Sequence, residues 1–186
     1  IPYELISTLF MRGAFDQQDA AATALAVAIY GLGLPAFVMQ KALQPLFFAR
    51  EDTKRPFYYA LVSLAVNAGI AIGLVSTLGY LAAAIGTTLA GWAMVLLLWN
   101  GAKTMGPAAQ FDARFRDRLP KIMLASIGMG LVLVTFAGFM APMLAASGLR
   151  YIGLAILIFL GITSYFGIGQ LTGAFHYNDF RRALRR

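Results

Sequence analysis

The stretch VMQKALQPLFFAREDTKRP, residues 38–56, decides how this chain is folded. It begins as an apolar segment of the kind that crosses a membrane, yet it carries Lys41 and, one helical turn later, Pro45. It ends in the polar block AREDTKRP, residues 49–56. A charge and a proline are both costly inside a membrane helix. The segment is therefore expected to do more than span a bilayer.

The composition is that of a membrane protein. Of the 186 residues 60% are hydrophobic and only 12% are charged, whereas about a quarter of a soluble domain is charged. Five apolar runs have the length of roughly 20 residues that about 30 Å of hydrocarbon requires. They lie at about 20–48, 57–78, 80–99, 122–144 and 151–173. Because backbone polar groups in hydrocarbon must be satisfied within the segment, the sequence predicts an all-α integral membrane protein with five transmembrane helices.

The ends of the spans carry recognisable signals. Asp16 and Asp19 have the spacing of a capping box before the first span. Pro56 and Pro120 are expected in the first turns of the second and fourth spans, where a missing N–H costs nothing. The second and third spans meet at the short stretch TLGY, residues 77–80, so we expect a tight helical hairpin around Gly79.

The basic residues gather on one side of the membrane. Loops alternate sides after each span, and this places twelve basic residues on one side and only two, Arg12 and Arg150, on the other. The positive-inside rule then predicts a cytoplasmic C-terminus, with the chain start and the turns at 77–80 and 145–150 on the outer side. The net charge of +7 is thus a topology signal, and no nucleic-acid partner is expected.

The sizeable loop at residues 100–120 divides the chain. Phe111, Phe115 and Leu119 are spaced four apart with arginines between them, which suits an amphipathic helix on the cytoplasmic leaflet. A plain solvated linker is the alternative. We therefore expect three parts: residues 1–100 with three spans, a connector at 101–120, and residues 121–186 with a helix pair and a basic tail.

The sequence contains no set of residues suited to catalysis. There is no cysteine, and the single histidine, His176, is expected to be an interfacial polar residue. No Ser-His-Asp set, phosphate-binding glycine loop or pair of intramembrane carboxylates is present. We expect neither an enzyme nor a cofactor.

The first span is the least regular of the five. Gly31, Gly33 and Pro35 interrupt its middle, and Pro45 interrupts its last third. A proline removes the bond to the carbonyl four residues earlier, so Pro35 frees the carbonyl of Gly31 and Pro45 frees that of Lys41. Broken helices that carry an intramembrane charge are typical of transporters.

Polar residues inside the spans are candidates for a binding or coupling site. Lys41 lies nine residues before Arg50, about 13 Å along a helix, so its ammonium group either snorkels to the surface or faces inward to an anionic partner. Asn67 stands in mid-span and either bonds a neighbouring helix or lines a site. Small residues four apart predict close helix packing. They are Gly69 and Gly73, Gly169 and Gly173, and Ala82, Gly86 and Ala90.

Three stretches carry a family resemblance. They are LFMRGAF, then YGLGLPAFVMQKALQPLFFAREDTKRP, and the hairpin NAGIAIGL…LGYLAAAIGTTLAGW. With them the chain resembles the MurJ/MviN lipid II flippases of bacterial cell-wall synthesis. The resemblance implies a fragment of a fourteen-helix, two-lobe transporter of the multidrug/oligosaccharidyl-lipid/polysaccharide exporter fold. Its five spans would be helices ten to fourteen, the last three of the second lobe and an extra C-terminal pair.

The resemblance also implies a function. The family moves lipid II, an undecaprenyl-pyrophosphate-linked precursor, from the inner to the outer leaflet of the bacterial inner membrane by alternating access. The implied partners are lipid II, membrane lipids and the N-terminal helices that this chain lacks. The last two spans, 122–144 and 151–173, would line a groove for the lipid tail. A related polysaccharide-lipid or drug exporter and a non-transporting scaffold of the same fold are the alternatives.

The resemblance makes Lys41, Asn67 and Thr87 the candidates for substrate binding or coupling. In some members of the family that the chain resembles, an Asn and an Asp four residues apart bind sodium together with a Thr on the next helix. Asn67 and Thr87 match that spacing, but Ala71 stands where the Asp would be. No metal site is therefore predicted.

The topology can be tested with single cysteines at Thr53 and Thr104, in the two basic loops. We expect both to be labelled by a membrane-impermeant thiol reagent only when the cytoplasmic face is open to it. Labelling of either cysteine from outside intact cells would overturn the predicted orientation.

Overall fold

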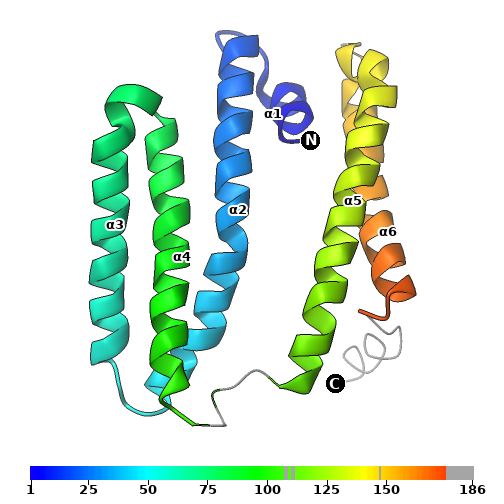
Figure 1. Cartoon of the computed structure of the whole chain (residues 1–186). Helices are drawn as coiled ribbons and strands as arrows, with labels where there is room; N and C mark the ends of the chain where they lie inside the picture. The colour runs from blue at the N-terminus through cyan, green and yellow to red at the C-terminus, as the bar shows by residue number, and fades with distance from the viewer. Residues whose placement is uncertain (107–108, 110–111, 147, 175–186) are drawn as a thin grey trace. The chain divides into compact units, whose positions relative to one another are not determined.

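Six helices follow one another along the described part of the chain, residues 1–106, 109, 112–146 and 148–174 of a computed structural model, which contains no strand there (Figure 1). They are α1 (Pro2–Phe10), α2 (Gln17–Phe48), α3 (Lys54–Leu78), α4 (Leu81–Lys103), α5 (Ala113–Ala145) and α6 (Arg150–Leu171). The last five are long and apolar enough to cross a membrane, which confirms the five predicted spans and the all-α class. The short helix α1 was not predicted. Phe111, His176 and the basic tail lie outside the described residues.

The helices form two separate units. One holds residues 1–20 and 111–186, and the other holds residues 21–110. The long helix α2 begins in the first unit and continues through the second. Each unit is described by itself.

Local signals set the helix starts and the hairpin. The N–H of Asp19 donates to the Asp16 carboxylate at 2.9 Å, and the N–H of Asp16 donates to the Asp19 carboxylate at 3.2 Å. This reciprocal pair confirms the predicted capping box. Gly79 ends α3 with φ at +54°, a conformation that a residue with a Cβ rarely adopts, and α4 begins two residues later. The predicted hairpin is confirmed.

The two prolines at helix starts behave differently. Pro56 lies in the first turn of α3, as predicted. Pro120 lies inside α5, so the prediction of a first-turn position is wrong. The helix begins earlier because Asp112 caps it, accepting the N–H of Phe115 at 2.8 Å, and because the charged residues that follow favour a helix. The first turns of α5 therefore occupy part of the predicted connector.

The second unit is built around α4. Its small residues Ala82, Gly86 and Ala90 are buried, which confirms the predicted packing face. The Ser63 hydroxyl of α3 donates to the Ala90 carbonyl at 2.8 Å. By contrast, the Gly69 and Gly73 positions of α3 have no atom within 4 Å, so in the described chain this pair packs against nothing.

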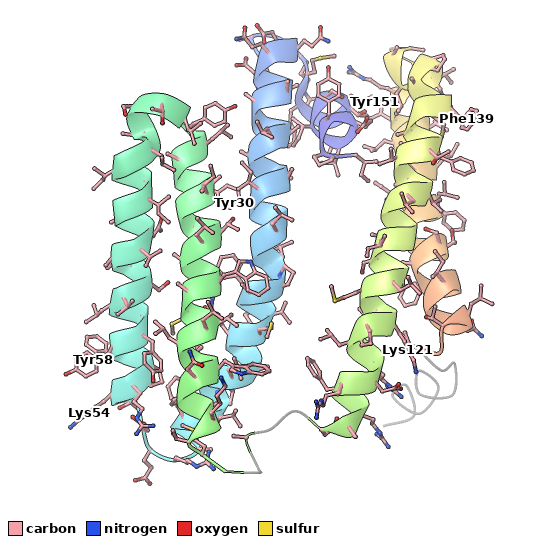
Figure 2. The ribbon with its side chains drawn as sticks, in the orientation of Figure 1. Tyr30, Lys54, Tyr58, Lys121, Phe139 and Tyr151 are labelled. Carbon is pink, nitrogen blue, oxygen red and sulfur yellow. The ribbon has the colours of Figure 1, made fainter. Side chains whose placement is uncertain are left out.

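Three helices of this unit meet at the end of α4. The ring of Phe47 in α2 lies edge-on to that of Tyr59 in α3, with the centroids 6.1 Å apart. A Cβ at Gly101 would be 2.6 Å from the Tyr59 hydroxyl and 3.1 Å from the Phe47 ring, so only glycine fits. Nearby, the Arg50 guanidinium donates to the Met105 carbonyl at 2.7 Å. The basic segments after α2 and after α4 thus lie at one end of the unit, where Figure 2 also shows Lys54 and Tyr58 of α3.

The first unit is a pair of antiparallel helices with α1 beside it. Small residues let α5 and α6 approach closely, because a Cβ at Gly161 would lie 3.3 Å from the Leu133 side chain and one at Gly153 would lie 3.2 Å from that of Leu144. A cavity of about 350 Å³ separates α1 from the last turns of α5. Glu4 and Ser7 line one side of it, and alanines and Leu144 line the other.

The contact between Asn67 and Gly86 gives a stability prediction. A Cβ at Gly86 would lie 2.8 Å from the Asn67 side-chain oxygen and 2.9 Å from its carbonyl oxygen, and the carbonyl cannot rotate away. We expect Gly86→Ala to lower the free energy of unfolding by about 1–3 kcal/mol, the usual cost of overpacking.

The matched control is Gly69→Ala, which replaces a helical glycine in open space. It should leave stability unchanged or raise it slightly, since alanine favours a helix. Thermal unfolding of the purified protein in detergent measures both variants. Equal melting temperatures for the two would contradict the packing described for Gly86.

Candidate functional site

The helix α2 presents one face to α4 and the opposite face outward. Ala36, Leu43 and Phe47, spaced seven and four residues apart, are buried. Lys41 lies on another face of the helix and is exposed. Leu34 and Phe48, seven residues before and after Lys41, share its face and are 61% and 51% exposed. Lys41 therefore stands on a face of α2 that α3 and α4 leave open.

The four residues expected to interrupt α2 do not break it. Gly31, Gly33, Pro35 and Pro45 all lie within one continuous helix. Figure 1 shows the ribbon of α2 changing direction in its second half, as proline-containing helices do. Near the first proline, the neighbouring helix α4 donates hydrogen bonds to two carbonyls of α2.

Three side-chain hydrogen bonds join α2 to α4, and we call them the α2–α4 clamp. The Thr88 hydroxyl donates to the Ile29 carbonyl at 3.0 Å, and the Trp92 indole N–H donates to the Leu32 carbonyl at 3.0 Å. In the other direction, the Gln40 amide donates to the Gly91 carbonyl at 3.0 Å. Carbonyl oxygens have two lone pairs, so each can accept a bond in addition to that of its own helix.

Two glycines make this approach possible. A Cβ at Gly33 would lie 3.2 Å from the Thr88 hydroxyl oxygen. A Cβ at Gly91 would lie 3.3 Å from the Phe37 ring. Each helix thus has a glycine where the other places a side chain, and the contact is tight in both directions.

The other candidates gather at a different contact, between α3 and α4. Asn67 packs on Gly86, and the backbone nitrogen of Ala71 would lie 3.5 Å from a Cβ at the same glycine. Thr87, half-buried, is the next residue of α4. Asn67 and Ala71 are therefore brought together beside Thr87, whereas Lys41 belongs to the outward face of α2.

The charges near these candidates are few. The ion pairs in the described chain include Asp52 with Arg55 at 3.3 Å and Asp117 with Lys121 at 2.7 Å, both at helix starts. Among the described residues no group of three His, Cys, Asp or Glu side chains could hold a metal ion. The Asn67 contact brings amide and backbone atoms together, and Ala71 stands where the resemblance would place the Asp of a sodium site.

Thr88, Trp92 and Gln40 were not among the residues singled out from the sequence. An indole N–H and an amide inside apolar helices need partners, and that requirement was the available signal. Their partners are backbone carbonyls, which no sequence pattern identifies.

Comparison with known proteins identifies the family. The model of the lipid II flippase MurJ family matches residues 3–151. The chain belongs to the MurJ family. A probable lipid II flippase MurJ of Rhizobium tropici is 34% identical over 186 residues, covering 98% of this chain and 35% of that protein. The resemblance stated from the sequence is confirmed.

Other MurJ proteins give the same result. The probable lipid II flippase MurJ of Rhizobium meliloti (strain 1021) is 34% identical over 98% of this chain and 34% of its own length. The lipid II flippase MurJ of Burkholderia cenocepacia is 29% identical over 97% of this chain and 35% of its own length. The chain thus spans about a third of the length of the curated MurJ relatives that it matches.

Proposed function

We propose that the chain is the C-terminal part of a lipid II flippase, a multi-pass transporter of the bacterial inner membrane that moves lipid II from the inner to the outer leaflet by alternating access. The observation that carries the proposal is the MurJ family match over residues 3–151, together with relatives of that name along nearly the whole chain. This match favours a flippase over a drug exporter and over a non-transporting scaffold.

The parts that we assign agree with the two units except for residues 1–20, which belong to the unit of α5 and α6. We assign residues 1–100 to the last three helices of the second lobe, 101–120 to the connector, and 121–186 to the extra pair. In support, α2 and α3 both pack on α4, while α5 and α6 pack on each other. The C-terminus is assigned to the cytoplasm and the chain start to the outer side, in agreement with the placement of Arg50 beside Met105 at one end of the second unit.

Lys41 is the residue we assign to the anionic part of the substrate or to a carboxylate in the helices that the chain lacks. Moving a lysine to the centre of a bilayer costs about 2.5–3.5 kcal/mol, so an exposed intramembrane lysine needs an anionic or aqueous partner. The described chain contains no ion pair to Lys41. A lysine ammonium binds phosphate oxygens as a point charge, and the pyrophosphate of lipid II offers such oxygens.

The extra pair is assigned to the lipid tail. The apolar side chains of Leu131, Val134 and Phe139 on α5 are 66–79% exposed, and Phe159 on α6 is 68% exposed. Figure 2 shows Phe139 projecting outward from α5. An undecaprenyl chain needs an apolar surface of this kind. Asn67 and Thr87 are assigned to coupling through the α3–α4 contact.

Substitution of Lys41 tests the proposed role. In the full-length protein, we expect Lys41→Ala to lower lipid II translocation roughly tenfold, the typical effect of losing a bond to a charged group. Lys41→Arg keeps the charge and should stay within about threefold of the unmodified protein. Lipid II exposure on the outer leaflet, together with growth when the protein is the sole flippase, measures the effect.

The matched control is Lys54→Ala, which removes an exposed lysine at the start of α3. It should translocate lipid II at the normal rate. Equal activity of Lys41→Ala and Lys54→Ala would show that Lys41 only snorkels to the membrane surface and does not bind an anionic partner. Absence of lipid II translocation by the unmodified full-length protein would refute the proposed function itself.

A further inference from the structure

The three bonds of the α2–α4 clamp all end on backbone carbonyls rather than on side chains. A carbonyl on a helix has a fixed direction. A hydrogen bond to it therefore forms only when that helix has a particular rotation about its axis. Ile29 and Leu32 are on one side of Pro35 and Gln40 is on the other. The clamp therefore holds α2 on both sides of its proline.

The clamp also lies where α2 is weakest. Pro35 has no N–H to donate to the Gly31 carbonyl, and Ile29 and Leu32 flank that position. Helices bend at such points with little resistance. Bonds from Thr88 and Trp92 on this segment limit that bending, because both donors belong to a neighbouring helix whose own small-residue face is buried.

Steric contacts act in the same direction as the hydrogen bonds. The Thr88 hydroxyl sits over Gly33 and the Phe37 ring sits over Gly91. Rotation of α2 by one residue, about 100°, would put a residue with a Cβ in place of Gly33 under Thr88 and would move the Phe37 ring away from Gly91. The packing of α2 on α4 therefore has one favoured rotation.

The direction of Lys41 follows from this rotation. Gln40 is bonded to α4, and the next residue along a helix is turned about 100° away. Lys41 consequently leaves the face that carries Ala36 and Leu43 and joins the exposed one. A loosened α2 can turn the lysine toward the apolar face of α4, where an unpaired charge is costly.

We propose that Thr88, Trp92 and Gln40 are positioning residues: their three hydrogen bonds fix the rotation of α2 and so aim Lys41 at its anionic partner. The part that concerns Lys41 and its partner rests on the proposed function. The part that concerns the fixed rotation of α2 does not, and the two parts are tested separately.

The first test measures local opening of α2 by hydrogen–deuterium exchange of the full-length protein in lipid nanodiscs, without lipid II. The variants are Thr88→Val, which removes one donor and keeps the shape of the side chain, and Trp92→Phe, which removes one donor and keeps an aromatic ring of smaller size. We expect exchange of the amides between Ile29 and Leu43 to rise roughly fivefold for each bond lost. Exchange in α5 should not change.

Two further variants control this test. Thr135→Val removes a hydroxyl that bonds only within α5, to the Leu131 carbonyl, and should leave exchange in α2 unchanged. Thr88→Ser keeps the hydroxyl and should restore normal exchange, even if Thr88→Val folds poorly. Unchanged exchange in α2 with Trp92→Phe, or an equal rise along the whole chain, would overturn the positioning role.

The second test is a double-mutant cycle on lipid II translocation. We expect Thr88→Val with Trp92→Phe to lower the rate at least fivefold when Lys41 is present, and to cause no further loss in the Lys41→Ala background. Losses that multiply in both backgrounds would mean that the clamp acts on stability alone and would overturn the link to Lys41. If the unmodified protein translocates no lipid II, the proposed function fails, and the exchange experiment still decides whether the clamp fixes α2.

Discussion

A proline inside a membrane helix deprives one carbonyl of its donor, and in hydrocarbon no water replaces that donor. The helix α2 contains two such prolines, Pro35 and Pro45, and is still continuous over 32 residues. Its neighbour α4 holds the segment before the first proline, because Thr88 and Trp92 donate hydrogen bonds to the carbonyls of Ile29 and Leu32. The packing of α2 on α4 in the second unit depends on these hydrogen bonds between the two helices.

The same constraint explains the character of α4. To reach the backbone of α2 with short side chains, α4 must lie close to it, and Gly91 together with Gly33 on α2 permits that distance. On its other side Gly86 receives Asn67 of α3 in the same manner. Both α2 and α3 thus pack on α4. The Lys41 face of α2 does not contact α4 and is free for a partner.

Features that depend on a few adjacent residues could be predicted from the sequence. The five spans follow from apolar length, the capping box from Asp16 and Asp19, and the hairpin from Gly79. Pro120 was misjudged because the cap at Asp112, which starts α5 earlier, stands in a charged stretch that was expected to be a connector. Polarity alone did not distinguish a loop from the first turns of a helix.

Features that depend on contact between helices could not be predicted in the same way. The positions of Thr88 and Trp92 give no sign of which carbonyls they meet, since the acceptors are 59 and 60 residues away along the chain. The face on which Lys41 lies follows from the burial of Ala36 and Leu43, which periodicity in a uniformly apolar helix does not reveal. The small-residue rule held for Gly86 but not for Gly69, because spacing alone does not tell which face has a neighbour.

The central claim is that α2 packs on α4 through the Ala36 face, which turns the Lys41 face away. A Cβ at Gly91 would lie 3.7 Å from the Cβ of Ala36, a separation suited to a disulfide. Since the chain has no cysteine of its own, the pair Ala36→Cys with Gly91→Cys can be oxidised in membranes and compared with Leu34→Cys with Gly91→Cys. The account predicts rapid cross-linking of the first pair and none of the second, and cross-linking of the second pair in preference to the first would contradict it.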